Sequence, residues 1–541
     1  MGSREARALA VAVTVIAWSA AGAVVDAGTA AGATPRGTAA APALPSDLNG
    51  DGFADVVVGV PDEDVGTIQD AGTVNVLYGS ADGLVVAGNE LWHQDVAGVL
   101  GGAESGDRFG WASASGDFDG DGYADLAVGV PLEDIGDVAD AGAVNVLYGT
   151  AEGLSANGNQ IWHQDTVGIP DTAEQGDRFG ASLAGGDFDA DGFVDLAVGV
   201  PLEDWEGRSD AGVVHVLYGT AEGLTASGTQ LWRQGGDGIP GAAEYYDEFG
   251  SALAAANHGR GRAADLAVGA PGESFSCGGF CVLNGVGAVD VIYGSLSGLT
   301  ATGAKQFIEE ETPGFDDEGA RFGSALAPGN FGRGGLRDLA VGIPGSGIFD
   351  YDFGAVRVLY RTSTGLSTDG AQTFTQPPPE TREKADEFGA ALAAGNVGGT
   401  AHDDLVAAAP FDPIGDPMNA GAVSVFFGTV DGLTADGAQT WTQSSAGIAD
   451  APETGDLFGR AIFVAKFGKS LRRDLAIGVP GEAVGPDADA GVLQVIYGST
   501  GGLDSTGAQL WTQDLPGVGG SSEPGDHLGC SLVGSPSRTC T

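Results

Sequence analysis

The feature that most constrains this 541-residue chain is a nine-residue acidic pattern that recurs at a nearly constant interval. In one full copy the pattern runs from Asp117 to Asp125, with acids at positions 1, 3, 5 and 9 and Gly122 at position 6. A period of this length indicates an array of structural repeats, each packed on its neighbours. The last acid of each copy is Asp55, Asp125, Asp195, Asp265, Asp338, Asp404 and Asp474, in steps of 70, 70, 70, 73, 66 and 70 residues.

Each repeat contains four short runs that are typical of β-strands. One run follows a Phe-Gly pair such as Phe109-Gly110, and a second is the Asp-Leu-Ala-Val-Gly-Val-Pro run that begins at Asp125. A third ends at Tyr148 or its equivalents, and a fourth carries an aromatic residue such as Trp162. Short β-branched runs bounded by Gly, Pro and Asp indicate strands. Seven repeats of four strands predict an all-β fold, a seven-bladed β-propeller of four-stranded blades.

The two ends of the array predict how the ring closes. The first repeat begins directly at its acidic loop, Asp47, with no Phe-Gly strand before it. After the seventh repeat, residues 525–532 resemble an eighth Phe-Gly strand with nothing after it. We therefore expect this C-terminal strand to complete the first blade and to remove the free edges of an open array. The expected propeller covers residues 46–534, and residues 535–541 form a C-terminal tail.

The N-terminus has the pattern of a cleavable secretory signal, which we assign to residues 1–33. Arg4 and Arg7 precede an apolar stretch over residues 8–23, and small residues suited to cleavage follow. A membrane anchor is the alternative, but the stretch is short for a span. Residues 34–45 are expected to be a flexible leader. We expect a secreted, extracellular monomer with no membrane span.

The charge of the chain excludes several classes of partner. With 23 basic and 74 acidic residues, the formal net charge is −51. Binding to phosphates requires Lys and Arg to replace counterions, so no nucleic-acid partner is expected. The same charge suits a soluble secreted protein or one that collects cations. Hydrophobic residues make up 43% of the chain, which indicates a folded core and not a disordered acidic tail.

The chain contains four cysteines, Cys277, Cys281, Cys530 and Cys540. An even number in an exported protein favours two disulfides. Three pairings are possible, and the local pairs Cys277–Cys281 and Cys530–Cys540 would close small loops without distorting strands. Free buried thiols or a metal site are the alternatives, although C-x3-C without a second cluster is a weak zinc motif.

Three of the seven acidic loops carry a complete set of oxygen donors, so we expect about three structural Ca²⁺ sites. Ca²⁺ takes six to eight oxygens, which alternating acids and the carbonyl of position 7 can supply. Mg²⁺ demands tighter geometry, and the loops lack the His or Cys typical of zinc. The alternative, an Asp-Gly turn capped by its own carboxylates, does not explain three loops with the same four positions. The predicted ligands are Asp47, Asn49, Asp51, Phe53 and Asp55; Asp117, Asp119, Asp121, Tyr123 and Asp125; and Asp187, Asp189, Asp191, Phe193 and Asp195.

The other four loops keep the final Asp but lose the inner acids, and three of them gain basic residues. Our hypothesis is that a side-chain cation replaces the metal near the retained Asp. The alternative is a solvated loop with unpaired charges. The basic residues are Arg260 and Arg262; Arg333 and Arg337; and Lys469, Arg472 and Arg473.

The Phe-Gly pair, the acidic loop and the Gly-Val-Pro run together resemble the FG-GAP repeats of the integrin alpha-chain β-propeller, over roughly residues 46–534. The resemblance implies seven blades, with mostly structural calcium in the loop between the first and second strands of a blade. It also implies ligand contacts on the opposite face, made by the loops after the second and fourth strands. Here the calcium loops fill the first three repeats, whereas integrins carry them in later blades. No stalk domains or membrane span follow in this sequence, so only the propeller, and not the integrin heterodimer, is expected.

If that geometry holds, aromatic residues of the third to fifth repeats lie in the ligand-binding connections. Exposed clusters of aromatic residues with carboxylates suit carbohydrate or protein recognition. The alternative is that these side chains pack onto their own loops. The candidate ligand residues are Trp205, Tyr245, Tyr246, Phe315, Phe349 and Tyr351.

The sequence gives little support for catalysis. Its six histidines are scattered, and His93 and His163 occupy equivalent repeat positions, which favours a structural role. We find no G-x-S-x-G, H-E-x-x-H or phosphate-binding Gly motif. We therefore expect an extracellular binding or adhesion module for a protein or carbohydrate ligand, with no enzyme activity. The alternatives are a secreted hydrolase or lyase acting from the same face, and a structural protein of the cell surface or matrix.

Overall fold

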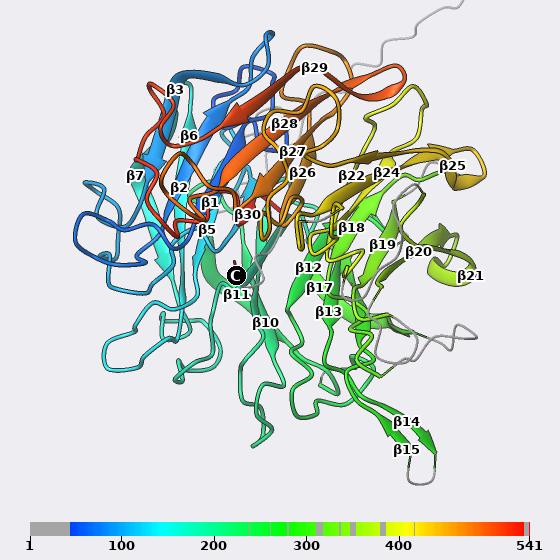
Figure 1. Ribbon diagram of the computed structural model, residues 1–541. Helices are drawn as coiled ribbons and strands as arrows, with labels where there is room; N and C mark the ends of the chain where they lie inside the picture. The colour runs from blue at the N-terminus through cyan, green and yellow to red at the C-terminus, as the bar shows by residue number, and fades with distance from the viewer. Residues whose placement is uncertain are drawn as a thin grey trace, which may run out of the picture. The chain divides into compact units, whose positions relative to one another are not determined.

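A computed structural model describes residues 44–534 and Cys540, apart from 237, 260, 279–280, 310–317, 335–336, 347–352, 379–385 and 416. All of these residues belong to one compact unit, Ala39–Thr541. Seven four-stranded antiparallel sheets are arranged as a seven-bladed β-propeller, with no helix in the described residues (Figure 1). The predicted fold class is confirmed. Consistent with this, the described part of the chain contains no helix long and apolar enough to span a bilayer.

Six blades take their strands in chain order, from the inner to the outer edge. Blade 2 is β4 (Ala112–Gly116), β5 (Asp125–Val130), β6 (Ala143–Thr150) and β7 (Gly153–Trp162), and blade 3 is β8 (Ser182–Gly186), β9 (Asp195–Val200), β10 (Val213–Tyr218) and β11 (Thr225–Trp232). Blade 4 is β12 (Ala252–Ala256), β13 (Asp265–Ala270), β16 (Ala288–Ser295) and β17 (Gly298–Ile308), and blade 5 is β18 (Leu326–Gly329), β19 (Asp338–Ile343), β20 (Ala355–Thr362) and β21 (Gly365–Phe374). Blade 6 is β22 (Ala391–Gly395), β23 (Asp404–Ala409), β24 (Ala422–Thr429) and β25 (Gly432–Trp441), and blade 7 is β26 (Ile462–Ala465), β27 (Asp474–Val479), β28 (Val492–Ser499) and β29 (Gly502–Trp511). A hairpin of β14 (Phe275–Gly278) and β15 (Cys281–Leu283) is inserted between β13 and β16 and projects from blade 4 (Figure 1).

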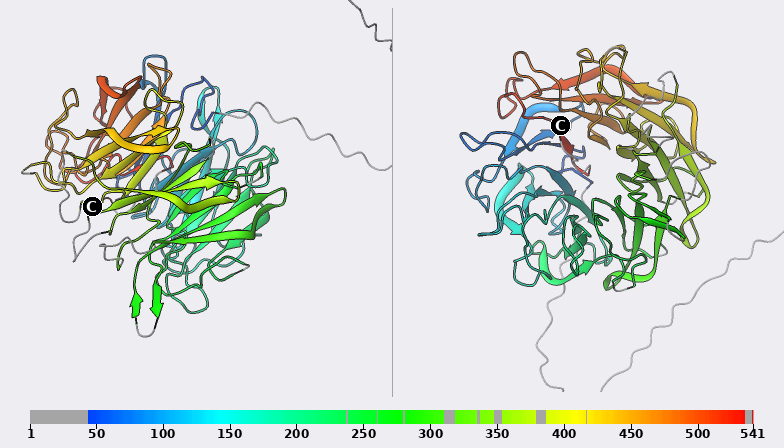
Figure 2. Two further views of the ribbon diagram at one scale, coloured as in Figure 1. Left: turned by 90° about the vertical axis from the view of Figure 1, so that its right-hand side faces the viewer. Right: turned by 60° about the horizontal axis from the view of Figure 1, so that its bottom comes forward.

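Blade 1 joins the two ends of the described chain. It combines β1 (Val56–Val60), β2 (Thr73–Tyr78) and β3 (Val85–Trp92) with the last strand, β30 (Ser531–Leu532). The closing strand pairs antiparallel with β1, with Leu532 opposite Val58 and Ser531 opposite Gly59. Figure 2 shows the blue and red ends of the colour scale meeting in this part of the ring. The predicted closure is confirmed.

One of the two predicted disulfides lies beside this closing strand. Cys530 and Cys540 are bonded, with their Cα atoms 5.5 Å apart. The predicted pair Cys277–Cys281 falls on residues whose side chains lie outside the described part of the structure.

The hydrophobic core lies between blades, and each of the seven blade interfaces has its own cluster. The second strand of every blade is buried along its whole length because a neighbouring blade covers each of its faces. At the interface of blades 1 and 2, Phe109 is fully buried among residues that include Val74 and Val128. Gly110 must follow it because its φ is 94° and a Cβ there would lie 2.5 Å from the Thr73 carbonyl oxygen. The Phe-Gly pair therefore encodes blade packing.

Candidate metal centres and a cavity on the opposite face

The acidic loops all lie at one end of the blades. Because neighbouring strands are antiparallel, the connections from first to second and from third to fourth strand share one face, which we call the lower face. The connections from second to third strand and from blade to blade share the other, the upper face. The nine-residue loops precede the second strand of each blade, so they belong to the lower face.

In blades 2 and 3 the loops gather three carboxylates that could hold one cation. Single oxygen atoms of Asp117, Asp119 and Asp125 lie within 4.8 Å of one another, as do those of Asp187, Asp189 and Asp195. Asp117 Oδ1 is buried and has no hydrogen-bond partner among the described residues, so the donor set fits a hard cation. Burial, with a further contribution from the charge of Asp121, raises the pKa of Asp119 to about 6.

The fifth loop position turns the chain and does not join these clusters. The Oδ1 atoms of Asp121 and Asp191 accept hydrogen bonds from the backbone N–H groups of Tyr123 and Phe193, at 2.9 and 3.0 Å. In blade 1, the N–H of Asp51 donates to Asp47 Oδ1 and Asn49 Oδ1, both at 3.0 Å. A self-capped turn would make the same bonds, so the three-carboxylate clusters are the feature that favours a cation.

The ninth position has a second role that the sequence reasoning missed. Asp125 Oδ2 accepts from the N–H of Phe118 at 2.7 Å, and its Oδ1 accepts from the N–H of Gly149 at 2.9 Å. The carboxylate thereby ties the start of the loop to the end of the third strand. Asp404 does the same in blade 6, which lacks the inner acids. The retention of this Asp in all seven loops was the available signal for a structural role.

Two of the basic residues in the other loops, Arg333 and Lys469, have partners other than the retained aspartates. The Arg333 guanidinium lies 4.0 Å from the Tyr360 ring centroid, and its Nε donates to the Asp431 carbonyl oxygen at 2.7 Å. Lys469 Nζ lies 3.8 Å from the Tyr497 ring centroid and donates to a carbonyl oxygen of β29 at 2.6 Å. These cations therefore bond to carbonyls and tyrosine rings, and they act on the retained aspartates only through space. Burial raises the pKa of Asp474 to about 7, and the charge of Lys469 opposes that rise.

Three of the six predicted ligand aromatics lie in the described part of the chain. The Trp205 ring is half-buried under the guanidinium of Arg233, a residue of the connection after β11, at 4.1 Å from the ring centroid. Tyr245 and Tyr246 are 59% and 60% exposed, with ring centroids 6.4 Å apart. These assignments stay predictions. The other three candidates, Phe315, Phe349 and Tyr351, lie outside the described residues.

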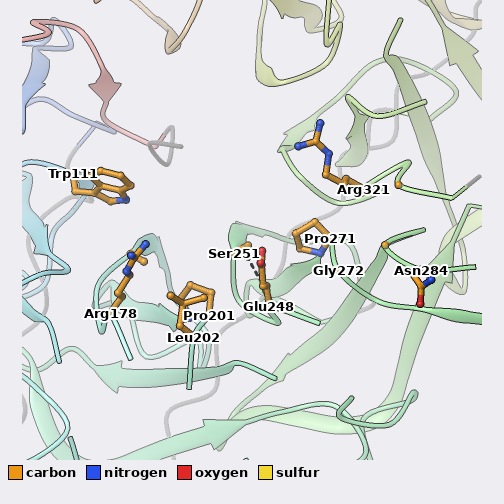
Figure 3. Close-up of a pocket in the computed structure, with 13 residues that line it drawn as sticks. Trp111, Arg178, Pro201, Leu202, Glu248, Ser251, Pro271, Gly272, Asn284 and Arg321 are labelled. Atoms are coloured by element: carbon orange, nitrogen blue, oxygen red, sulfur yellow. Dashed lines mark hydrogen bonds between the residues drawn. The ribbon is translucent and has the colours of Figure 1, made fainter. Parts of the chain in front are cut away.

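A cavity of about 590 Å³ opens on the upper face, where the chain enters the inner strands of blades 2 to 5. Figure 3 shows Trp111, Arg178, Glu248 and Arg321 arranged around it, from four successive blades. Arg178, Glu248 and Arg321 occupy the same repeat position, directly before Phe-Gly, with φ of 62°, 53° and 58°. This left-handed turn precedes each inner strand and brings the three side chains to the cavity. The sequence shows that these three residues occupy the same position in the repeat, but it does not show that their side chains meet at one cavity.

The arginines around the cavity differ in whether their side chains already have an ion-pair partner. Arg321 pairs with Glu387 at 2.9 Å, and Arg108, at the equivalent position in blade 2, pairs with Asp62 at 3.0 Å. Arg178 is exposed and makes no side-chain hydrogen bond or ion pair within the described part of the chain. Trp111 and the apolar wall that includes Pro201 complete the cavity. The cavity therefore offers an unpaired guanidinium and an aromatic ring.

Comparisons with known proteins agree with this architecture. The FG-GAP repeat family matches residues 39–77, 109–147 and 179–217. The chain is 35% identical over 173 residues to the phosphatidylinositol-glycan-specific phospholipase D of Rattus norvegicus, covering 32% of this chain and 20% of that protein. It is 30% identical over 230 residues to integrin alpha-PS2 of Drosophila melanogaster, covering 41% of this chain and 14% of that protein.

A third relative, integrin alpha-5 of Xenopus laevis, is 34% identical over 160 residues, covering 28% of this chain and 14% of that protein. The chain thus spans a fifth or less of the length of these three relatives. Among solved structures, a Bacillus licheniformis rhamnogalacturonan lyase aligns with a TM-score of 0.36 and 12% identity over 84% of this chain and 71% of that chain, a likeness too weak to carry an argument. The repeats, the integrin matches and the seven blades together identify this chain as an integrin-like β-propeller protein built from FG-GAP repeats.

Proposed function

We propose that this protein is a secreted, calcium-stabilised propeller that binds an extracellular protein or carbohydrate ligand on its upper face. The observation that carries the proposal is the cavity of about 590 Å³ whose lining includes the unpaired Arg178 guanidinium and the Trp111 ring. Secretion rests on the signal pattern of residues 1–33, and calcium rests on the lower-face clusters. The choice of this face is supported by the integrin resemblance, which implies ligand contacts on the face opposite the acidic loops.

The chemistry of the cavity suggests what the ligand carries. A guanidinium presents a planar fork of donors that matches a carboxylate, and this pairing is stronger than a neutral hydrogen bond. The parts of Trp111, which is 7% exposed, and of Pro201 that reach the cavity offer a small apolar surface for a sugar ring or an apolar side chain. Although the chain carries a net charge of −51, the lining of this cavity includes Arg178 and Arg321, whose guanidinium groups could donate hydrogen bonds to an anionic group. We therefore propose a ligand with a carboxylate next to a ring or apolar group.

The cavity favours binding over catalysis. Glycoside hydrolysis uses two carboxyl groups about the scissile bond, and Glu248 is the only carboxylate among the described lining residues. No histidine lies among those residues either. The name phospholipase D belongs to relatives of which this chain covers about a quarter or less, so it supports a hydrolase only weakly.

Array binding in the presence of calcium tests the proposal. The full secreted chain is screened against acidic and neutral glycans and against peptides with and without carboxylate side chains. For the strongest ligand, Arg178→Ala and Trp111→Ala are each expected to weaken binding about tenfold or more. Arg208→Ala is the matched control, since Arg208 lies in an upper-face loop and is already paired with Glu206 at 3.4 Å.

Two results would contradict the proposal. One is equal affinity of the parent chain and both cavity variants for every ligand found. The other is chemical turnover of the bound ligand, which would support the hydrolase or lyase alternative.

A further inference from the structure

The two halves of the lower face carry opposite charge. The nine-residue loops of blades 1 to 3 contain three carboxylates in blade 1 and four each in blades 2 and 3, with no Lys or Arg. The loops of blades 4 to 7 span residues 257–265, 330–338, 396–404 and 466–474 and are rich in cations instead. We call the described cations of these four loops the basic band: Arg262, Arg333, Arg337, Lys466, Lys469, Arg472 and Arg473.

Carboxylates leave most of the basic band unneutralised. The acids of the same four loops are the buried ninth-position aspartates, which accept from backbone N–H groups, and Asp403, which pairs with Arg337 at 3.0 Å. Arg472 donates to an amide oxygen and to a backbone carbonyl oxygen, at 3.1 and 3.3 Å. Arg262 and Arg473 make no side-chain hydrogen bond or ion pair with any described residue. A hydrogen bond to a neutral oxygen leaves the charge of a guanidinium unchanged, so the band is a cationic surface.

The hairpins between third and fourth strands differ in the same blades. These hairpins share the lower face with the nine-residue loops. At their tips, blades 1 to 3 each have an Ala followed by an acid, whereas blade 4 has Leu296-Ser297 and blade 6 has Val430-Asp431. Blades 5 and 7 have neutral polar or Gly residues there. Loss of a calcium site in one loop does not explain a change in a separate hairpin, so the difference belongs to this half of the face as a whole.

Three aliphatic side chains project from the same half of the face. Leu471, in the blade 7 loop, is 93% exposed, and Leu296 and Val430, at the hairpin tips, are 83% and 72% exposed. They lie among the cations, since Leu471 stands between members of the basic band and the Val430 carbonyl oxygen accepts from the Arg333 N–H at 3.1 Å. Among the described residues, the one other large hydrophobic side chain as exposed as these is Val167, at 94%, on the upper face.

We infer that the lower face of blades 4 to 7 docks onto an anionic lipid surface. The cations attract negative headgroups, and the aliphatic loop tips enter the boundary between headgroups and acyl chains. Each Lys or Arg that reaches such a surface strengthens binding about fivefold. The net charge of −51 does not prevent this, because charges farther from the lipid than a Debye length of about 8–10 Å are largely screened.

The exposed aliphatic side chains favour a lipid surface over a soluble polyanion. A hydrated polymer would meet the cations but would offer no apolar phase to Leu471 or Val430. Single-stranded nucleic acid binds by stacking its bases on aromatic rings, and the Tyr360 and Tyr497 rings are each covered by a cation of the basic band. Docking by the lower face leaves the upper-face cavity open to solvent, so this inference is independent of the ligand proposed above.

Cosedimentation of the full chain with lipid vesicles tests the inference. In buffer with Ca²⁺, we expect binding to vesicles of phosphatidylcholine mixed with phosphatidylglycerol, little binding to phosphatidylcholine alone, and weakening by added salt. The double variant Arg262→Glu, Arg473→Glu should bind the mixed vesicles at least about twentyfold more weakly. Leu471→Ser should weaken binding about fivefold or more, because it removes apolar surface that enters the lipid.

Matched controls lie on the upper face. Val167→Ser removes an equally exposed aliphatic side chain, and Arg208→Glu reverses one exposed charge, so both should bind the vesicles like the parent. All substituted residues are exposed or lack side-chain partners except Arg208, and melting temperatures verify that each variant is folded. Equal binding to both kinds of vesicle, or parental binding by the double variant and by Leu471→Ser, would overturn the inference. Binding to soluble dextran sulfate without binding to vesicles would also overturn it, in favour of a polyanion.

Discussion

The ninth loop residue shows how one side chain can be retained for a reason other than its most visible chemistry. Asp404 is fully buried, and its carboxylate accepts from the N–H groups of Val397, Gly398 and Gly428 at 3.0, 2.9 and 2.9 Å. Its loop has no inner acids, so these bonds exist independently of a cation. The pattern of acids alone therefore does not show whether a carboxylate is a metal ligand or an acceptor of hydrogen bonds from backbone N–H groups.

Asp404→Ala tests this structural role. The substitution leaves three N–H groups without their acceptor, and each unsatisfied buried group costs about 1–3 kcal/mol. We expect the free energy of unfolding to fall by at least about 2 kcal/mol, as measured by urea denaturation at pH 7. Asp436→Ala, at an exposed position of the same blade, should stay within about 0.5 kcal/mol of the parent. Equal stability of the two variants would contradict the assignment.

Asp290 makes the propeller less stable as the pH rises. It is buried in β16, and burial raises its pKa to about 8, with a hydrogen bond from Gln234 opposing the shift. Because the folded-state pKa lies above the unfolded value of about 3.9, the stability that its protonated form contributes is complete below about pH 4 and is lost as the pH rises through 8. Blades 1 and 2 carry the neutral residues Asn75 and Asn145 in the matching part of the third strand.

Asp290→Asn is therefore expected to be more stable than the parent at pH 8, by more than about 1 kcal/mol. The advantage should shrink as the pH falls toward 4, because Asp290 stays neutral in the folded state and the unfolded-state carboxyl, with a pKa of about 3.9, also becomes protonated. Urea unfolding of both proteins at pH 4.5, 6 and 8 measures the difference. A difference that is constant across this range would show that ionisation of Asp290 is not its cause.

At the scale of elements, the closing strand is short and depends on its surroundings. β30 contributes two residues to blade 1, and the Cys530–Cys540 bond anchors the chain directly beside it. A cross-link over a separation of ten residues contributes about 2–3 kcal/mol by restricting the unfolded chain.

Cys540→Ser should accordingly lower the melting temperature of the protein. Differential scanning calorimetry without reductant measures the change, and the matched control is the Cys277→Ser, Cys281→Ser double variant, which leaves the closing strand untouched. The role given to the bond would be wrong if Cys540→Ser melts at the same temperature as the parent.

The elements also show how far the sequence could lead. Strand order, closure by residues 525–532 and the three acidic loops follow from comparing the copies, because a repeat fixes each position within its blade. The upper-face cavity does not follow from that comparison. Arg178, Glu248 and Arg321 are about 70 residues apart, and only the ring brings them together. The hydrogen bond from Gln164 to Glu203 was equally hidden, since the two residues are 39 positions apart and lie in adjacent blades.

For the whole molecule, the acidic loops are distributed unevenly around the ring. Blades 1 to 3 carry the acidic loops, whereas blades 5 and 7 use Arg333 and Lys469 against tyrosine rings. A ligand that binds only the folded state stabilises it by about 2.7 kcal/mol when its concentration is 100 times its Kd.

Removal of calcium with a chelator is thus expected to lower the melting temperature, and added Ca²⁺ should restore it. Hydrogen exchange should show the loss of protection concentrated in blades 1 to 3, with blade 5 as the internal control. A melting temperature that does not respond to the chelator would refute structural calcium in this propeller.

The pairing of β30 with β1 also makes the first blade the last to be finished. Three of its strands come from the start of the described chain and the fourth from near its end, so a chain emerging from its N-terminus cannot complete the circle before residue 532 is available. Until then, the backbone groups of Val58 and Gly59 are an unpaired sheet edge that invites association with other chains. The ring therefore closes only after the whole repeat array has been made. A truncated chain that lacks β30 would keep an unpaired strand edge at β1.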